Sequence, residues 1–262
     1  MELGIRGRTA MVAAGSKGLG RAIAAALVAE GARVSICARS AAPLADTERA
    51  LRDAGGEVLA MQVDVSSADD LARWHAATVE KLGPPALVLT STGGPPAGMF
   101  EELTEDAWRA GIDSTLMNVV RLSRLVLPAM RAARHGRIVH LTSFVAKQPM
   151  QILTVSSTLR AGLSALTRTM AAQVAGDGIT VNAILPGHFL TDRQVHVNEL
   201  RARQHGIPRA AWEERLMAEI PAGRFGRPEE LADAVVFLMS DRAGYINGAS
   251  LQVDGALIGS TF

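Results

Sequence analysis

Short apolar runs alternate with longer helix-like segments along the whole chain. Runs of strand length occur at Thr9–Ala14, Ala32–Arg39, Val58–Val63, Ala86–Thr90, Arg137–Ser143, Ile179–Leu185 and Ser250–Val253. The segments between them carry apolar residues at helical spacing. Strands that are apolar at consecutive positions are buried on both faces, so the alternation predicts a parallel sheet covered by helices on either side. We therefore expect an α/β fold, built as a single doubly wound domain over residues 1–262.

Composition and charge exclude several classes of function. Of the 262 residues, 48% are hydrophobic, and the formal net charge of +1 gives no reason to expect a nucleic acid or an anionic membrane as partner. No segment has the pattern of a signal peptide, and no apolar run reaches membrane-spanning length. The single cysteine, Cys37, lies inside the second predicted strand and cannot form an intrachain disulfide. We expect a cytoplasmic protein with a plain core role for Cys37 and no metal site.

A glycine-rich turn separates the first apolar run from the helical segment that follows it. The turn reads Gly15-Ser16-Lys17-Gly18-Leu19-Gly20. Glycines let the backbone approach a pyrophosphate closely, and the helix that follows presents unpaired N–H groups and a positive dipole end to that anion. The spacing differs from the G-x-G-x-x-G of the long-chain dehydrogenases. Strand, turn and helix together predict a dinucleotide site.

Two cations indicate which dinucleotide binds. The second apolar run ends in Arg39-Ser40, where a carboxylate would bind the ribose 2′-hydroxyl of NAD and an arginine accommodates a 2′-phosphate. Lys17 lies within the glycine turn itself. The alternative is that both are solvated surface residues, the usual position of Arg and Lys. Their joint placement beside the predicted phosphate site favours NADP(H).

The chain resembles the short-chain dehydrogenases/reductases over essentially its whole length. Aligning the last two glycines of that family's T-G-x-x-x-G-x-G motif with Gly18 and Gly20 brings Ala13 and Ala14 to the positions of the Thr and the first Gly. The resemblance implies a Rossmann fold that binds NADP(H) and reduces a small-molecule carbonyl or oxidises an alcohol. It also implies a homotetramer formed by the helices around 104–134 and 154–175 and by the last strand.

Further cofactor contacts are implied by the same resemblance. Asp64 and Val65, after the third predicted strand, match the family's segment that contacts the adenine amino group, and Asp64 is equally suited to a helix N-terminus. Where the family carries N-N-A-G, this chain has Thr90-Ser91-Thr92-Gly93. Hydroxyls there, including that of Thr92, can still hydrogen-bond a ribose, and Gly93 is retained.

The sixth predicted strand leads into a segment that matches the family's P-G-x-x-x-T element. Pro186 and Gly187 begin it, and Thr191 stands where the family binds the nicotinamide carboxamide. The residues that follow, at about 188–221, form the family's variable substrate lid. In this chain the lid is basic, with Arg193, His196, Arg201, Arg203, His205 and Arg209. A basic lid over a cleft with apolar residues such as Phe144 and Phe189 suggests an apolar substrate with an anionic group, whereas the alternative for most of the basic residues is a solvated helix face.

The expected catalytic positions depart from the family's pattern. Ser143 matches the serine that hydrogen-bonds the substrate carbonyl, but Tyr-x-x-x-Lys is replaced by Ser156 and Arg160. These two residues are four apart and share one helix face. An aliphatic hydroxyl is too weak an acid to replace a phenol, whereas Arg160 can still bind the ribose hydroxyls of the cofactor but stays permanently charged, so we interpret Ser156 and Arg160 as binding groups. The family's relay asparagine aligns with Thr115, and Asn118 follows one turn later.

The missing tyrosine leaves the proton donor open. Lys147 and His188 are the titratable candidates near the expected cleft, although a solvent-facing lysine and a packed loop histidine are equally plausible. We expect that no single side chain replaces the tyrosine and that the substrate is an activated carbonyl, such as a quinone or a 1,3-diketone.

The resulting hypothesis is an NADP(H)-dependent oxidoreductase of the ketoreductase or alcohol dehydrogenase type with atypical proton donation. One alternative is a non-redox enzyme similar to the halohydrin dehalogenases, which however lose the glycine loop and keep the tyrosine. The other is a non-catalytic NADP(H)-binding sensor or scaffold.

Overall fold

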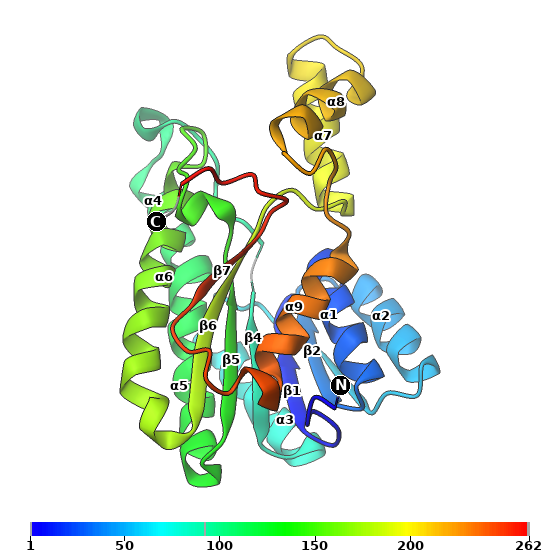
Figure 1. Cartoon of the computed structure of the whole chain (residues 1–262), viewed down its shortest axis with the longest axis vertical. Coiled ribbons are helices and arrows are strands. Elements are labelled where there is room, and N and C mark those ends of the chain that lie inside the picture. The colour runs from blue at the N-terminus through cyan, green and yellow to red at the C-terminus, as the bar shows by residue number, and fades with distance from the viewer. Residues whose placement is uncertain (1, 92, 261–262) are drawn as a thin grey trace.

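Seven parallel strands form the centre of the molecule in the order β3-β2-β1-β4-β5-β6-β7 (Figure 1). Their bounds are β1 (Thr9–Val12), β2 (Arg33–Ala38), β3 (Val58–Gln62), β4 (Pro85–Thr90), β5 (Gly136–Leu141), β6 (Ile179–Pro186) and β7 (Ser250–Val253). Each neighbouring pair is parallel, which confirms the predicted α/β class. This computed structural model describes residues 2–91 and 93–260.

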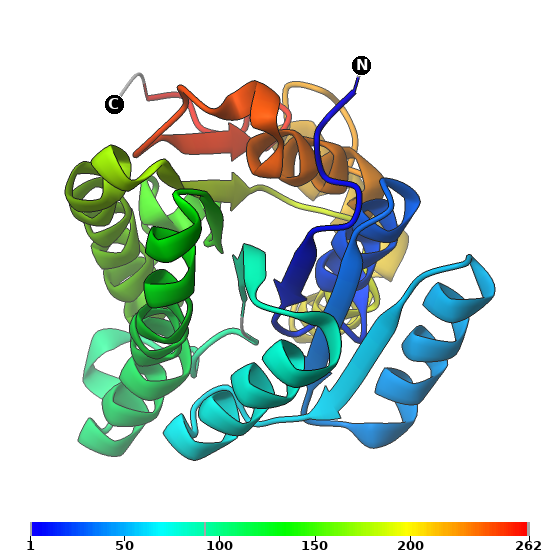
Figure 2. The same cartoon turned by 90° about the horizontal axis from the view of Figure 1, so that it is seen from below.

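Helices cover both faces of the sheet (Figure 2). Their bounds are α1 (Gly18–Ala29), α2 (Ala41–Asp53), α3 (Ala68–Leu82), α4 (Glu105–Gly111), α5 (Asn118–Ala133), α6 (Thr154–Val174), α7 (Asp192–Gln204), α8 (Arg209–Glu219) and α9 (Pro228–Met239). On one face, α1, α2 and α9 bury residues such as Leu27 and Val235, and on the other α3, α5 and α6 bury residues such as Trp74 and Val126. Successive strand residues alternate between these two cores, as Ala10 and Met11 do, so the strands are apolar throughout.

Two expected elements differ from the structure. The helix expected over about 104–134 is interrupted by a π-helical turn (Ile112–Met117) between α4 and α5. This wider turn shifts which side chains face inward, and such turns are frequent at functional sites. The fifth strand ends at Leu141 rather than at Ser143, because Ser143 already opens a short 3-10 turn (Phe144–Ala146).

The helices α7 and α8, here called the α7–α8 segment, project beyond the end of the sheet (Figure 1). They pack on each other, and α8 contributes no buried residue. Within α7 the buried Asn198 accepts a hydrogen bond from Gln194 and donates one to Glu213 of α8. Polar contacts thus provide much of the cohesion of this segment. None of the helices among residues 2–91 and 93–260 combines the length and apolar character needed to cross a membrane.

Candidate functional site

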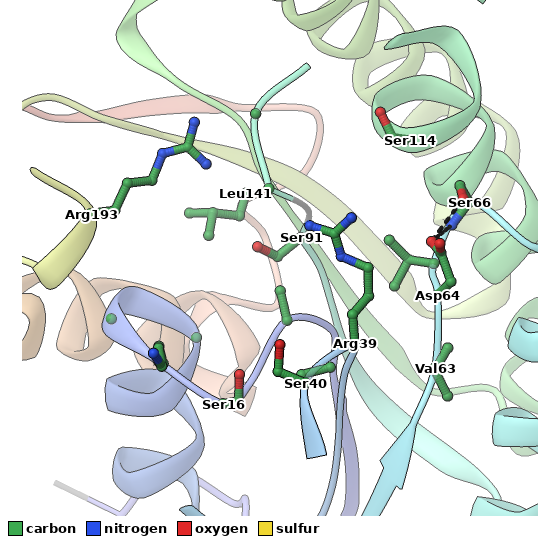
Figure 3. Close-up of a pocket in the computed structure, with 18 of the residues that line it drawn as sticks. Ser16, Arg39, Ser40, Val63, Asp64, Ser66, Ser91, Ser114, Leu141 and Arg193 are labelled. Atoms are coloured by element: carbon green, nitrogen blue, oxygen red, sulfur yellow. Dashed lines mark hydrogen bonds between the residues drawn. The ribbon is translucent and has the colours of Figure 1, made fainter. Parts of the chain in front are cut away.

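A cavity of about 930 Å³ opens at the carboxyl ends of the strands (Figure 3). It lies where the chain order of the sheet reverses, between β1 and β4, which is where open α/β sheets bind ligands. Eleven of the predicted cofactor residues line it together: Ser16, Lys17, Gly18, Leu19, Gly20, Arg39, Ser40, Asp64, Val65, Gly93 and Thr191. Thr92, also predicted, lies outside the described residues.

The backbone of the glycine turn is packed too closely for side chains at its key positions. A Cβ added to Gly20 would lie 2.2 Å from the carbonyl oxygen of Ala14, and Gly18 has a φ of +51°. Ala14 itself has a φ of 53°, in the left-handed region that favours glycine. Gly15 does not line the cavity but packs on Ile36 of β2, where an added Cβ would lie 2.9 Å from Cγ2. The turn therefore brings bare backbone to the cavity wall.

The N-terminus of α1 faces this cavity without a capping side chain. Helix α1 begins at Gly18, Lys17 precedes it without a capping hydrogen bond, and its first turn carries no acidic residue. The first N–H groups of a helix have no partner within the helix, and the macrodipole adds a partial positive charge there. The wall of the cavity at Gly18–Gly20 is therefore suited to an anion such as a pyrophosphate.

Three of the cations that line the cavity have no counter-charge in the structure. Lys17, Arg39 and Arg193 form no ion pair with any residue among 2–91 and 93–260, whereas Arg121 pairs with Asp113 at 2.8 Å. The side chains of Arg39 and Arg193 extend into the cavity from opposite sides (Figure 3). The cavity therefore holds three cations that no ion pair within the described part of the chain neutralises.

Asp64 lies just beyond β3, as predicted. Its Oδ1 accepts hydrogen bonds from the N–H and the hydroxyl of Ser66, at 2.9 and 2.7 Å. These two bonds, and to a lesser degree the charge of Arg39, hold the pKa of Asp64 below its usual range. The helix N-cap is Ser67 instead, which accepts from the N–H of Asp70. The ionised Asp64 thus stays beside Arg39 at one end of the cavity.

The P-G-x-x-x-T segment connects β6 to α7. Gly187 donates a hydrogen bond to Val253 at 3.0 Å and approaches Asp254 so closely that a Cβ would lie 2.8 Å from its Cα. Thr191 caps α7, and its methyl carbon would lie 3.3 Å from a Cβ on Gly18. Thr191 lines the cavity, whereas Pro186 and Gly187 lie behind its lining.

Ser156 and Arg160 form a buried pair on α6, each 7% exposed. Nε of Arg160 donates to Oγ of Ser156 at 3.1 Å, and Nη1 donates to the carbonyl oxygens of Leu141 and Thr142 at 3.3 and 2.8 Å. Burial, and to a lesser degree the charge of Arg193, lowers the pKa of Arg160 to about 10. Arg160 remains charged at neutral pH and joins α6 to the end of β5. The side chain of Leu141 lines the cavity, so this pair lies directly behind its wall.

Ser143 follows the end of β5 and is half-buried. Its Oγ accepts a long hydrogen bond of 3.4 Å from the N–H of Val145. The hydroxyl proton of Ser143 has no acceptor among the described residues, so the hydroxyl is available as a donor.

Lys147 and His188, like Ser143, Ser156 and Arg160, do not line the large cavity. The Nζ of Lys147 donates to Gln252 on β7 at 3.1 Å. His188 packs between Phe144 and Phe225 and lies 3.4 Å from Gln194, beside a smaller pocket of about 170 Å³. Burial lowers its pKa. Neither side chain is presented to the large cavity.

The π-helical turn and α5 contribute a polar group to the cavity that the sequence pattern did not predict. Ser114 and Asp113 line the cavity, whereas Thr115 is fully buried. Arg121 also lines it and donates to the carbonyl of Ser66 at 2.7 Å, bridging α5 to the loop after β3. No local signal distinguishes Ser114 from Thr115, because the π turn decides which of them faces inward. Among the residues that the structure describes, no cluster of His, Cys, Asp or Glu could hold a metal ion.

Comparison with known proteins gives several matches over nearly the whole chain. A family model described as enoyl-(acyl carrier protein) reductase matches residues 13–257. The 3-oxoacyl-(acyl-carrier-protein) reductase FabG of Pseudomonas aeruginosa is 33% identical over 255 residues, which is 97% of this chain and 99% of that relative.

Two solved structures are also similar. The L-sorbose reductase of Gluconobacter frateurii, in complex with NADPH and L-sorbose, is 30% identical, with a TM-score of 0.95 over 99% of this chain and 100% of that one. An NADPH-bound short-chain oxidoreductase of Pseudomonas aeruginosa PAO1, described as containing an atypical catalytic center, is 31% identical, with a TM-score of 0.88 over 97% and 98% of the two chains.

Proposed function

This chain belongs to the short-chain dehydrogenase/reductase family, and on that premise we propose that it is an NADP(H)-dependent oxidoreductase that reduces a carbonyl compound or oxidises the corresponding alcohol, with an atypical arrangement for the proton. The observation that carries the proposal is the cavity itself. One wall is the glycine turn with the open N-terminus of α1, and the opposite wall lies directly in front of Ser156 and Arg160. A cofactor site thus adjoins a polar pair that lies behind the wall of the same cavity.

The residues present fit NADP(H). Only glycine can lie at position 20 without displacing the carbonyl of Ala14, so the pyrophosphate would be held by bare backbone at the start of α1. Lys17 and Arg39 would hold the 2′-phosphate, and Asp64 would accept from the adenine amino group. Thr191 would bind the carboxamide. When bound, NADPH supplies the hydride.

The substrate carbonyl would lie against Ser143 and Ser156. Because Oγ of Ser156 accepts from Nε of Arg160 at 3.1 Å, the hydroxyl proton of Ser156 points away from that nitrogen and can be donated to a substrate oxygen. The adjacent guanidinium charge strengthens this donor and stabilises an oxyanion. Ser143, whose hydroxyl proton is also unused, would be the second donor.

A dedicated acid is missing from this arrangement. The hydroxyls of Ser143 and Ser156 are far too weak as acids, and Arg160, with a pKa of about 10, holds its proton at neutral pH. Lys147 is engaged with Gln252, and His188 is packed between aromatic rings. We propose that the proton comes from water reaching the cavity, or that the substrate stabilises its own anion, as an activated carbonyl such as a quinone or a 1,3-diketone does.

Turnover tests the proposal. The purified protein is titrated with NADPH by fluorescence and then assayed for NADPH oxidation with quinones, 1,3-diketones and simple ketones. We expect NADPH to bind and activated carbonyls to be reduced faster than simple ketones. Absence of NADPH binding would contradict the proposal.

A second candidate is a non-catalytic NADP(H)-binding sensor or scaffold. It is favoured by the positions of Lys147 and His188, the two titratable candidates, which are engaged away from the cavity. Binding of NADPH without oxidation by any member of the carbonyl panel would support this function. A non-redox reaction like that of the halohydrin dehalogenases has less support, because the glycine turn is retained.

A further inference from the structure

Two guanidinium groups from different elements converge on one point of the large cavity. Arg39 directly follows β2, whereas Arg193 lies in the first turn of α7, where the α7–α8 segment begins. A Cβ built on Gly93 would lie 4.0 Å from Nη2 of Arg39 and 3.9 Å from Nη1 of Arg193. The two side chains enter the cavity from opposite sides (Figure 3). An anion of the size of a phosphate, placed between them, is therefore within reach of both.

Neither of these guanidinium groups is paired within the described part of the chain. Neither Arg39 nor Arg193 forms an ion pair or a side-chain hydrogen bond with any residue among 2–91 and 93–260. Asp64 is near enough to Arg39 for their charges to interact, but its Oδ1 accepts from Ser66 instead. Two like charges that converge in this way repel each other. An anion bound between them would relieve the repulsion and accept charge-assisted hydrogen bonds from both sides.

The position of Arg39 indicates which anion this is. In a dinucleotide site, an arginine at the end of the second strand accommodates the 2′-phosphate on the adenine ribose. The pyrophosphate has a different place, at the N-terminus of α1 beside Gly18 and Gly20. A phosphate monoester carries nearly two negative charges at neutral pH and three acceptor oxygens, enough for two guanidinium groups.

We propose that Arg193 and Arg39 bind the same phosphate, the 2′-phosphate of NADP(H), and that this phosphate holds the α7–α8 segment to the β2 side of the cavity. The inference rests on the proposed function and adds to it a residue that determines cofactor specificity from outside the strand ends. It also makes the position of the segment depend on the cofactor, because NADH has no 2′-phosphate.

The α7–α8 segment has few other contacts that would fix it. Within α7 the buried residues are Asn198 and Ala202, and α8 buries none. A segment with so little burial opens at a low cost in free energy. A phosphate shared between the first turn of α7 and the end of β2 would therefore add a substantial part of its attachment to the sheet.

Arg203 provides a matched control for Arg193. It lies on the same helix, is exposed, and does not line the cavity. Arg203→Gln removes the same charge from the segment as Arg193→Gln does. A difference between the two variants thus reports the position of the charge and not the net charge of the segment.

The first experiment measures the Kd of NADPH and of NADH by fluorescence titration. We expect Arg193→Gln to raise the Kd of NADPH by about tenfold or more, the range of a charge-assisted contact, and that of NADH by less than about twofold. Arg193→Lys should retain part of the affinity, because it keeps the charge but loses the planar pair of donors. Arg203→Gln should change neither Kd.

The other outcomes separate this inference from the proposed function. An equal loss of NADPH and NADH affinity in Arg193→Gln would assign Arg193 to the pyrophosphate and overturn the inference, and so would an unchanged Kd of NADPH. A loss confined to NADPH supports the inference whether or not a carbonyl is reduced. Failure of the unaltered protein to bind NADPH would refute both the inference and the proposed function.

The second experiment follows the α7–α8 segment itself. Hydrogen exchange of the backbone amides of residues 192–204 is measured by mass spectrometry on protein saturated with NADPH or with NADH. We expect exchange to be slower with NADPH by about tenfold or more, since exchange tracks the free energy of local opening. Arg193→Gln should remove this difference, and Arg203→Gln should retain it. Equal exchange with the two cofactors in the unaltered protein would overturn the inference, because the 2′-phosphate would then not hold the segment.

Discussion

Arg160 donates a hydrogen bond from Nε to Oγ of Ser156, 3.1 Å away and one helical turn earlier on α6. A hydroxyl that accepts from a fixed cation can donate its own proton in only one remaining direction. The pair is therefore an oriented hydrogen-bond donor rather than an acid. This distinction decides what its substitution does.

Ser156→Ala should lower kcat by no more than about tenfold, because it removes one hydrogen bond to the substrate oxygen and no proton donor. Arg160→Ala should instead weaken NADPH binding, since its charge lies beside the proposed ribose site.

Lys147→Ala and His188→Ala should each lower kcat by less than the roughly 10²-fold to 10⁴-fold typical of a lost general acid. Steady-state kinetics with a quinone substrate measures these effects. A loss of kcat above about a thousandfold in Ser156→Ala, Lys147→Ala or His188→Ala, with NADPH affinity intact, would reveal a dedicated acid.

Arg39→Ala should reduce the preference for NADPH over NADH. The exposed guanidinium of Arg39 lines the cavity and has no ion pair in the described part of the chain, so it is free to bind a 2′-phosphate directly. A charge-assisted contact contributes about 1.5–3 kcal/mol, or roughly one to two decades in Kd. Fluorescence titration with both cofactors measures it, and Arg49→Ala, on the exposed face of α2, is the control. Equal affinities for NADPH and NADH that Arg39→Ala leaves unchanged would contradict the prediction.

Two substitutions in the glycine turn should have opposite effects, one raising the stability of the apoprotein and the other weakening NADPH binding. Ala14→Gly removes the cost of a left-handed backbone, about 1–2 kcal/mol, against a smaller gain in unfolded-state entropy, so the apoprotein should become slightly more stable. Gly20→Ala must displace the carbonyl of Ala14 and should weaken NADPH binding by about tenfold or more. Urea unfolding and fluorescence titration measure the two effects. Unchanged NADPH affinity in Gly20→Ala would show that the turn does not contact the cofactor.

His140 should make stability fall as the pH is lowered. Thr167 donates its hydroxyl proton to Leu163 at 2.7 Å, so Nδ1 of His140 must donate to Thr167 at 2.9 Å, and Nε2 is left without a partner among the described residues. Burial lowers the pKa of His140 from 6.5 to about 4. His140 is protonated below about pH 6.5 in the unfolded chain but only below about pH 4 in the native protein, so lowering the pH between these values favours unfolding.

The resulting loss approaches about 3 kcal/mol at pH 4. His140→Leu should therefore flatten the dependence of the free energy of unfolding on pH between 6.5 and 4, measured by urea unfolding. His196→Gln, at an exposed position on α7, is the control. An equal slope in the His140 variant and the unaltered protein would refute the burial argument.

We also predict a homotetramer. Strand β7 is at the edge of the sheet, Tyr245 is fully exposed just before it, and Leu251 on it is 39% exposed. Exposed apolar side chains beside an open strand edge indicate an interaction surface. Light scattering at micromolar concentration should show four copies, and Tyr245→Glu with Leu251→Glu should give smaller species. Leu200→Glu, equally exposed on α7, should not, and a monomeric unaltered protein would contradict the prediction.

The sequence alone determined the parallel sheet, the glycine turn and the arrangement of the predicted cofactor residues around one cavity. These features depend on short-range chemistry. Consecutive apolar residues require burial on both faces, and a close backbone approach requires glycine, so a local pattern identifies them. Lys17 and Arg39 follow for the same reason, because each is a fixed few residues from a strand end whose position in the sheet is set.

Tertiary structure decided which side chains complete the cavity. Arg193 lies about a hundred residues after Gly94 in the chain, and the two meet only because α7 starts beside Gly18 at the ends of the strands. Ser114 rather than Thr115 faces the cavity because a π turn widens the helix there. Lys147 reaches Gln252 on β7 because the turn after β5 directs it toward that strand. Each outcome depends on the packing of elements that are distant in the chain. The local sequence around a side chain does not predict which distant element it will contact.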